Sequence, residues 1–232
     1  AGSEMADILG ETAGGKKTTR RDPAIRPEVV VYDVDLTLTL PLGLTVTSAL
    51  NAIAHAMEGF YAPDRHPVTE ALSRDAMVAF RDALPALAKD AQDKEARAKA
   101  LYAAWGCSLT LGHVTMALHH KLAHVLGGSF GLPHAETHAV LLPHTTAYNE
   151  PAVGDLLKPI ADTFGGTAGA GLWHFAKSVG APLRLADLGF KETDLDRAAE
   201  IATKNPYANP RPVSRDGIRQ LLQQAHDGHC PD

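Results

Sequence analysis

Histidine is concentrated in one part of this chain, where residues 113–144 hold seven of the twelve histidines. His120 and His124 are four residues apart, so a helix through them places both side chains on one face. Asn51 and His55 form a second pair with the same spacing further upstream. A fold for this chain therefore has to accommodate two helices that each carry a polar pair.

Glycine and proline residues interrupt the chain just after the histidine pair. Gly127 and Gly128 are predicted to end that helix, and Pro133 with His134 delivers a further imidazole after a short loop. Polar side chains from two helices and a loop can then converge on one point. Such a convergence suits a metal site or a proton-transfer site.

The bulk composition excludes several classes of protein. The 232 residues suffice for a substantial core in one or two domains, and the net charge of -5 provides no basic field for nucleic acid. Because Cys107 and Cys230 are the only cysteines, we expect no disulfide framework and a cytoplasmic location. No apolar stretch approaches the ~20 residues of a membrane span, and residues 1–7 resemble no signal peptide but look like the start of a processed or truncated chain.

The first 35 residues differ from the rest in their pattern. Residues 16–20 and the β-branched run 28–32 are predicted to form a strand pair or two edge strands. Because two strands do not form an independently stable sheet, we expect them to complete a sheet supplied by residues outside this chain.

From residue 42 onward the pattern is helical almost throughout. Residues 100–126 are long, apolar and poor in charge, which favours one buried central helix. Pro85 is predicted to interrupt the helix that starts at Pro67. Further helices are predicted at 47–61, 140–148, 153–163, 168–179, 193–203 and 214–225. The chain is thus predicted to be mainly α.

The order of six segments resembles the C-terminal half of the iron-containing alcohol dehydrogenase family, and within it the maleylacetate reductases. These segments are residues 36–41, 51–58, 120–128, 133–138, 142–144 and 209–213. The run Pro-His-Ala-Glu-Thr-His at 133–138 is the part that is specifically similar to maleylacetate reductases.

The resemblance implies a helical-bundle C-terminal domain of a dehydroquinate synthase-like fold over residues 36–232. Residues 1–35 would be the remnant of an α/β nucleotide-binding domain, because no glycine-rich phosphate turn joins a strand to a helix here. The glycine-rich segment 165–171 lies between predicted helices, so we do not expect it to contact phosphate. The helical face that carries the polar cluster would meet the nucleotide domain.

The resemblance also implies which residues form the site. The family's metal ligands, one Asp and three His, fall on Asn51, His55, His120 and His134. An amide is a weak metal ligand, and maleylacetate reductases generally work without metal, so we expect no metal requirement. If a metal does bind, its expected ligands are His55, His120 and His134, with Fe or Zn as the alternative cofactor.

Other roles follow from the same resemblance. His124 is expected near the nicotinamide, with a proton-transfer or orienting role, beside the catalytic candidates His120, His55, His134 and Asn51. The remaining predicted contacts are Gly2, Ser3 and Leu36 for the cofactor, Lys121 and His138 for the substrate, and Glu136 as a supporting residue. His113 and His119 are expected to face other directions, His144 to pack in the core, and Glu58 to lie on a helix face.

The function implied is reduction of the carbon–carbon double bond of 2-maleylacetate by NADH or NADPH, which gives 3-oxoadipate in the degradation of aromatic compounds. We expect a small dicarboxylate substrate, a homodimer, and no nucleic-acid or membrane partner. Two alternatives stay open. One is a metal-dependent alcohol dehydrogenase of the same family, and the other is a catalytically silent helical domain.

Overall fold

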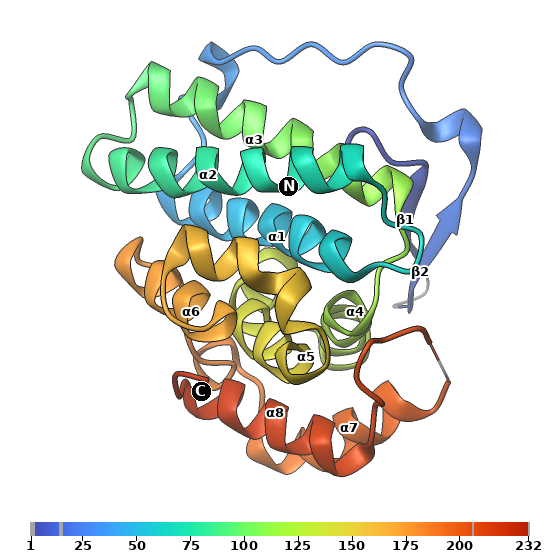
Figure 1. Cartoon of the computed structure of the whole chain (residues 1–232). Helices are drawn as coiled ribbons and strands as arrows, with labels where there is room; N and C mark the ends of the chain where they lie inside the picture. The colour runs from blue at the N-terminus through green and yellow to red at the C-terminus, as the bar shows by residue number, and fades with distance from the viewer. Residues whose placement is uncertain (1–2, 14–15, 206, 232) are drawn as a thin grey trace.

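The computed structural model describes residues 3–13, 16–205 and 207–231 and is mainly helical (Figure 1). Its helices are α1 (Leu42–Tyr61), α2 (Pro67–Lys89), α3 (Lys94–His113), α4 (Leu118–Phe130), α5 (His134–Phe164), α6 (Ala168–Ser178), α7 (Leu195–Thr203) and α8 (Arg215–Asp227). An antiparallel hairpin, β1 (Ile8–Ala13) and β2 (Lys16–Arg21), precedes them. The predicted helical domain with a short β pair at the start of the chain is confirmed.

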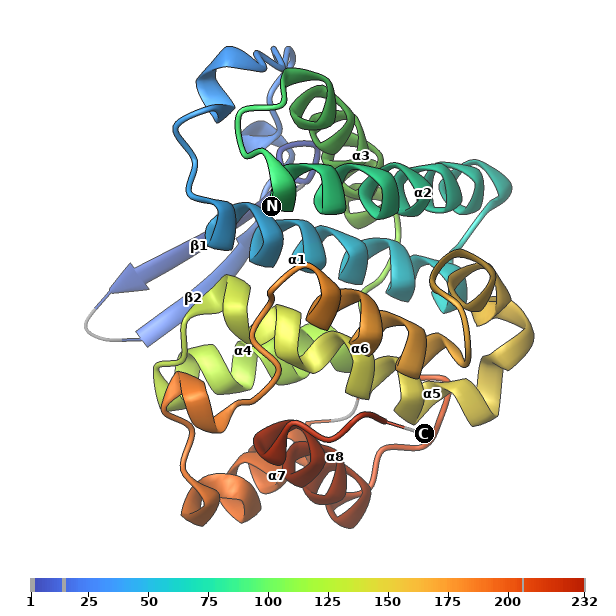
Figure 2. The ribbon, with the colours of Figure 1, turned by 90° about the vertical axis from the view of Figure 1, so that its left-hand side faces the viewer.

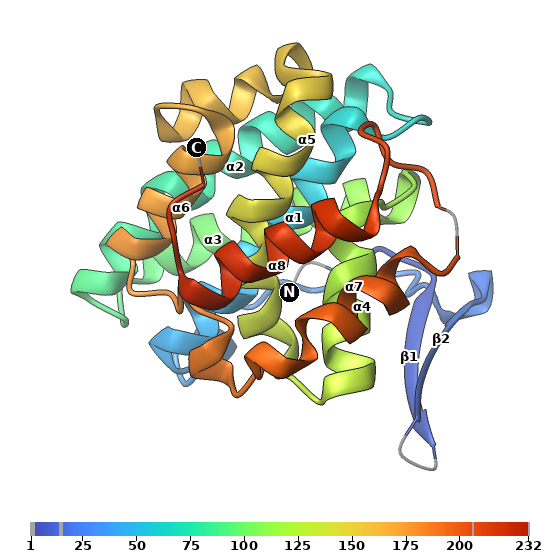
Figure 3. The same ribbon diagram turned by 90° about the horizontal axis from the view of Figure 1, so that it is seen from below.

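The helices are stacked in successive layers. α2 and α3 lie side by side on one face of α1, and α5 packs against its other face (Figure 2). α4 and α6 flank α5, and the α7–α8 pair closes the far end of the molecule. The β hairpin projects from the side of the helical body (Figure 3). α1 is consequently the central helix.

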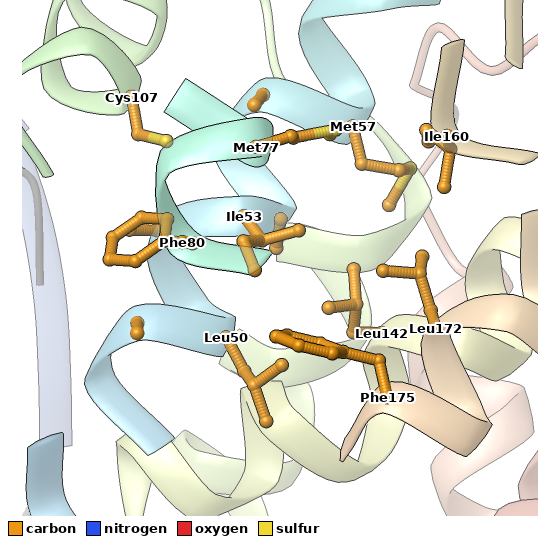
Figure 4. Packing of buried hydrophobic residues seen from close by; sticks show 14 of the residues in the cluster. Leu50, Ile53, Met57, Met77, Phe80, Cys107, Leu142, Ile160, Leu172 and Phe175 are labelled. Carbon is orange, nitrogen blue, oxygen red and sulfur yellow. The ribbon is translucent and has the colours of Figure 1, made fainter. Parts of the chain in front are cut away.

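The interior contains two hydrophobic clusters. The first joins α1, α2, α3, α5 and α6, and Figure 4 shows Ile53, Met57, Met77 and Phe80 meeting in it. The second joins α4, α5, α7 and α8. Because α5 contributes to both clusters, it links the two halves of the helical body. Among the described residues, none of the helices has the length and apolar character needed to cross a membrane.

The predicted single helix over residues 100–126 is wrong. α3 ends at His113, Val114 is extended (φ −130°, ψ 159°), and α4 starts at Leu118. An interruption of the helix of this kind leaves backbone N–H groups that need other acceptors. Two carboxylates from elsewhere supply them: Asp64 accepts from the N–H of Thr115 and Glu58 from that of Ala117. Long-range hydrogen bonds thus outweigh the helical preference of the local sequence.

Three other predicted boundaries also differ. Gly127 and Gly128 lie inside α4, which ends instead at Gly131 in the left-handed conformation (φ 71°). Pro85 lies within α2, whose neighbouring Leu84 and Leu87 are fully buried, so core packing offsets the missing backbone hydrogen bond. The predicted helices 140–148 and 153–163 both lie in α5, where non-helical Val153 (φ −141°, ψ 28°) separates two helical segments as predicted, but the first segment starts earlier, at His134.

The strand predictions were half right. Residues 16–20 are confirmed within β2, but their partner is β1 and not residues 28–32. Val29 and Val31 are 79% and 82% exposed in an extended segment that pairs with no strand in the described parts of the chain. A β-branched run needs a neighbouring strand to form a ladder, and this one has none here.

The C-terminal helices agree better with their predicted positions. α6 and α8 start one residue after Thr167 and Ser214, whose side chains accept hydrogen bonds from the backbone of Ala170 and Gly217. α7 starts at Leu195, two residues later than predicted, after a 3-10 turn. Side-chain caps mark the starts of α6 and α8, whereas Asp194 before α7 makes no side-chain cap hydrogen bond.

Candidate active site

The predicted polar residues converge on one pocket of about 670 Å³. It lies between α1, α4, α5 and the N-terminal segment, and it is lined by both predicted pairs and the later histidines. The predicted residues in its lining are Ser3, Asn51, His55, His120, His124, His134 and His138. His113, which was expected to face elsewhere, also lines this pocket, close to its solvent-exposed edge.

The imidazole rings in the pocket wall are in mutual contact. The ring centroids of His55 and His120 are 5.0 Å apart, and the two rings are stacked with an interplanar angle of 28°. His138 lies 5.2 Å from His120 and 4.5 Å from His134, both edge to face. Three helices therefore contribute to one continuous histidine cluster.

Glu58 is the functional candidate that sequence reasoning missed. It is fully buried, and its carboxylate accepts hydrogen bonds from the backbone N–H groups of Ala117 (2.8 Å) and His119 (2.7 Å). It also accepts from Nδ1 of His120 at 2.7 Å. The signal was present in the sequence, because Asn51, His55 and Glu58 follow i, i+4, i+7 spacing and share one helix face.

The bond to Glu58 defines the orientation of His120. A carboxylate accepts hydrogen bonds and donates none, so Nδ1 of His120 carries the hydrogen. Nε2 is the atom left for the pocket, and it is buried without a hydrogen-bond partner among the described residues. Such a carboxylate–histidine pair presents one ring nitrogen to a ligand in a defined tautomer.

A second buried pair lies behind the pocket wall. As predicted, His119 lies outside the pocket lining. It is fully buried, and its Nε2 is 2.9 Å from Nδ1 of His138. Burial lowers the pKa of both imidazoles well below the ordinary value, and repulsion from neighbouring histidines lowers it further. Both rings are therefore neutral at neutral pH.

The pocket lining includes a positive group. Among the described residues that line the pocket, Arg21 at the end of β2 is the one arginine or lysine. Its side chain is 55% exposed, and its Nη1 lies 3.4 Å from Oδ1 of Asp7. Asp64 also lines the pocket, where burial raises its pKa but two hydrogen bonds from Thr115 lower it overall. A carboxylate ligand thus has one permanent cation within the lining to pair with.

Three predicted contacts are not found in this pocket. Leu36 is 77% exposed in a 3-10 turn outside the lining, because that turn faces solvent. Lys121 follows His120 directly, and one helical residue of rotation turns it toward the ring of Tyr207, 5.7 Å away. Gly2 lies outside the described residues.

Two further predictions concern residues of α5. His144 is buried away from the pocket, as expected for a packing residue. Glu136 is half-buried and does not line the pocket. Neither residue therefore belongs to the histidine cluster.

The glycine-rich segment before α6 has a structural partner. The carboxylate of Glu150 accepts hydrogen bonds from the backbone N–H of Ala168 (2.8 Å) and Gly169 (3.3 Å). These are amides that a phosphate at the start of this helix would need. The expectation that the segment does not contact phosphate agrees with this arrangement.

The donor atoms in the pocket do not fit a resident divalent metal in this arrangement. Asn51 offers an amide, which is a weak metal ligand, and the buried carboxylate of Glu58 is hydrogen-bonded to backbone amides and to His120. The rings of His55 and His120 stack face to face rather than converge edge-on. Within the described parts of the chain, no three His, Cys, Asp or Glu side chains form a group that could hold a metal ion.

Comparisons with known proteins agree on one family. A family model described as "Fe-containing alcohol dehydrogenase family, C-terminal" matches residues 45–226. Over its whole length the chain is 55% identical to a maleylacetate reductase of Rhizobium sp. (strain MTP-10005), and the match covers 66% of that protein. A crystal structure of that reductase has a TM-score of 0.97 at 55% identity, again covering 100% of this chain and 66% of the other. A structure described as a putative alcohol dehydrogenase from Ralstonia eutropha JMP134 has a TM-score of 0.98 and 51% identity, again over 100% of this chain and 66% of its own. The chain spans about two thirds of the length of the curated relatives that it matches.

Proposed function

The chain belongs to the iron-containing alcohol dehydrogenase family, and we propose that it serves in the reduction of 2-maleylacetate to 3-oxoadipate by NADH or NADPH. The relatives that match it over its whole length at 45–55% identity carry the name maleylacetate reductase. The observation that carries the proposal is the Glu58–His120 pair, which opens on a pocket with Arg21 in its lining.

The proposed chemistry follows from the substrate. When bound, the dinucleotide supplies the hydride that reduces the alkene, and because the alkene is conjugated to a ketone this addition leaves an enolate. The enolate oxygen needs a hydrogen-bond donor, and the adjacent carbon needs a proton.

Residues of this chain meet both needs. In the proposal His120 keeps the hydrogen on Nδ1 and takes up a second proton at Nε2; this imidazolium donates a hydrogen bond to the ketone oxygen, and the carboxylate of Glu58 behind it offsets the charge. His124, whose ring centroid is 6.3 Å from that of His120, gives the proton to carbon. Arg21 pairs with a carboxylate of the substrate.

We propose that this reaction needs no metal. The family description names iron, so the proposal depends on the donor atoms: an amide at position 51 and a carboxylate that is occupied by amides. The test is NADH oxidation with maleylacetate by the full-length protein, before and after treatment with a chelator. Retention of at least half of the rate is expected. Loss of the rate on chelation and recovery with Fe²⁺ or Zn²⁺ would instead assign His55, His120 and His134 as ligands.

The alternative is an alcohol dehydrogenase that depends on metal, as the description of the Ralstonia eutropha structure suggests. The same assay discriminates the two functions, because an alcohol dehydrogenase oxidises small alcohols with NAD(P)⁺ and leaves maleylacetate unreduced. A chain that binds NADH but turns over neither substrate would support the third reading, a catalytically silent helical domain.

The remaining parts of the proposal concern the assembly. Residues 1–35 are proposed to belong to an α/β nucleotide-binding domain that meets the helical body at the pocket, which Ser3 and Arg21 line. Cys107 and Cys230 form no disulfide among the described residues, which is compatible with the proposed cytoplasmic location. A homodimer is part of the proposal on family grounds, and sedimentation of the full-length protein tests it.

A further inference from the structure

Three buried polar groups form a chain that ends at the pocket. Thr145 Oγ1 is 2.9 Å from Nδ1 of His119, and Nε2 of His119 is 2.9 Å from Nδ1 of His138. All three side chains are at most 1% exposed. His138 also lines the pocket, so this series of hydrogen bonds connects the pocket to the buried Thr145 on α5.

The direction of the hydrogen bonds starts at Thr145. Its hydroxyl has a single hydrogen, and this hydrogen points to the carbonyl oxygens of Leu141 (3.0 Å) and Leu142 (3.2 Å). Oγ1 is therefore the acceptor in its contact with the imidazole. His119 must carry its hydrogen on Nδ1 and donate it to Thr145.

The next step depends on the charge of His119. Among the described residues its ring has no carboxylate partner, because Glu58 accepts a hydrogen bond only from its backbone N–H. His119 is 0% exposed, and a buried imidazolium without a counter-charge is strongly unfavourable. His119 is neutral, so its Nε2 has no hydrogen and accepts from Nδ1 of His138.

The same reasoning applies to His138. Its ring is equally buried, with no carboxylate hydrogen-bonded to it among the described residues, so it too is neutral, and its single hydrogen is used at Nδ1. Nε2 is consequently an acceptor, and it is buried without a hydrogen-bond partner among the residues that the structure describes. An orphaned buried acceptor of this kind calls for a ligand group that donates to it.

We propose that Thr145 and His119 lock His138 in the Nδ1–H tautomer, so that its Nε2 accepts a hydrogen bond from an O–H or N–H group of the ligand in this pocket. A carboxylate is repelled at this position, because its lone pairs meet that of Nε2. His138 is thus a specificity residue for a hydroxyl or amide, and Thr145 and His119 are positioning residues. The proposal rests on the pocket alone and not on the reaction proposed above.

Nitrogen-15 NMR of the histidine side chains in the full-length protein tests the tautomer directly at neutral pH. The expected spectrum shows a hydrogen on Nδ1 of His138 and none on Nε2. A hydrogen on Nε2 of His138 would overturn the proposal, since it would mean that the chain of hydrogen bonds runs in the opposite direction.

The adjacent threonines give a matched pair of variants. Thr145 and Thr146 are both fully buried and both donate to carbonyls one turn back, but among the described residues Thr146 makes no hydrogen bond to a histidine. Thr145→Val removes the acceptor for His119 and should give a mixture of tautomers at His138. Thr146→Val should leave the tautomer unchanged. A T145V protein with the wild-type tautomer would remove Thr145 from the proposal, and the wild-type spectrum remains decisive if T145V does not fold.

Two probe pairs identify the ligand group. Nicotinamide and nicotinate differ by an amide donor, as the dinucleotide would present it, and malate and succinate differ by a hydroxyl, as a substrate enol would present it. The donating member of the responsible pair should bind about tenfold more tightly and shift the Nε2 resonance of His138. That preference should disappear in His138→Phe. Equal affinity within both pairs, or no response of Nε2 to any of the four probes, would overturn the ligand assignment.

Discussion

At the scale of single residues, Glu58 has the largest consequences for the site. A carboxylate with no exposed surface is costly unless its oxygens are hydrogen-bonded. Here the donors are the backbone of Ala117 and His119 and the ring of His120. One side chain from α1 therefore both supports the start of α4 and decides which nitrogen of His120 faces the pocket.

We expect Glu58→Gln to lower the free energy of unfolding by about 2–3 kcal/mol, because the amide NH₂ would leave a buried N–H donor without an acceptor. With His120 less firmly oriented, kcat should fall about 10–100-fold and KM should change less. Urea unfolding and steady-state kinetics measure the two effects. Glu136→Gln, in the half-buried first turn of α5, is the control and should change neither quantity appreciably. Wild-type stability and kcat in E58Q would contradict the role assigned to this carboxylate.

At the scale of elements, α1 is central because small residues let its neighbours approach. A Cβ on Gly59 would overlap the side-chain methyl of Thr110 on α3. Gly43, in the first turn of the same helix, has open space around the corresponding position. The two glycines thus differ only in packing, since both have helical backbone conformations.

Alanine substitutions at Gly59 and Gly43 should therefore change the free energy of unfolding in opposite directions. Gly59→Ala is expected to lower the free energy of unfolding by about 1–3 kcal/mol, because the added methyl overpacks the α1–α3 contact. Gly43→Ala should raise it by up to about 1 kcal/mol through helix propensity alone. Chemical denaturation of both variants beside the wild type decides the matter. Equal effects at the two positions would mean that α1 and α3 do not pack as closely as described.

At the scale of the whole molecule, the interior holds imidazoles that must stay neutral. His144 is 2% exposed, and burial, followed by repulsion from His229, lowers its pKa to about 4. In the unfolded chain an imidazole takes up its proton near pH 6.5. The unfolded state therefore binds the proton first as the pH falls, which favours unfolding.

Stability should accordingly depend on pH in a defined window. His144 contributes nothing to the pH dependence above about pH 6.5, and between about 6.5 and 4 it lowers the free energy of unfolding by up to about 3 kcal/mol. Unfolding curves at several pH values for the wild type and His144→Leu measure this contribution, which should be missing in the variant. His174→Gln, at an exposed position, should keep the wild-type dependence. A parallel dependence in H144L would show that His144 is not held neutral.

The sequence by itself determined the mainly helical class, the starts of α6 and α8 to within one residue, and the meeting of the histidine and Asn51 helices. These features depend on helical periodicity and on capping, which act within a few residues of one another. Four-residue spacing is enough to predict that His120 and His124 share a helix face.

Only the tertiary structure decided the features that depend on distant partners. The interruption between α3 and α4 and the burial of Glu58 depend on each other, because the backbone N–H of Ala117, which has no partner within a helix, donates to the carboxylate of Glu58 on α1. The rotation of Lys121 toward Tyr207 depends likewise on a contact 86 positions away in the chain. No local pattern encodes such hydrogen bonds and contacts, since their free energy exists only once the helices are packed.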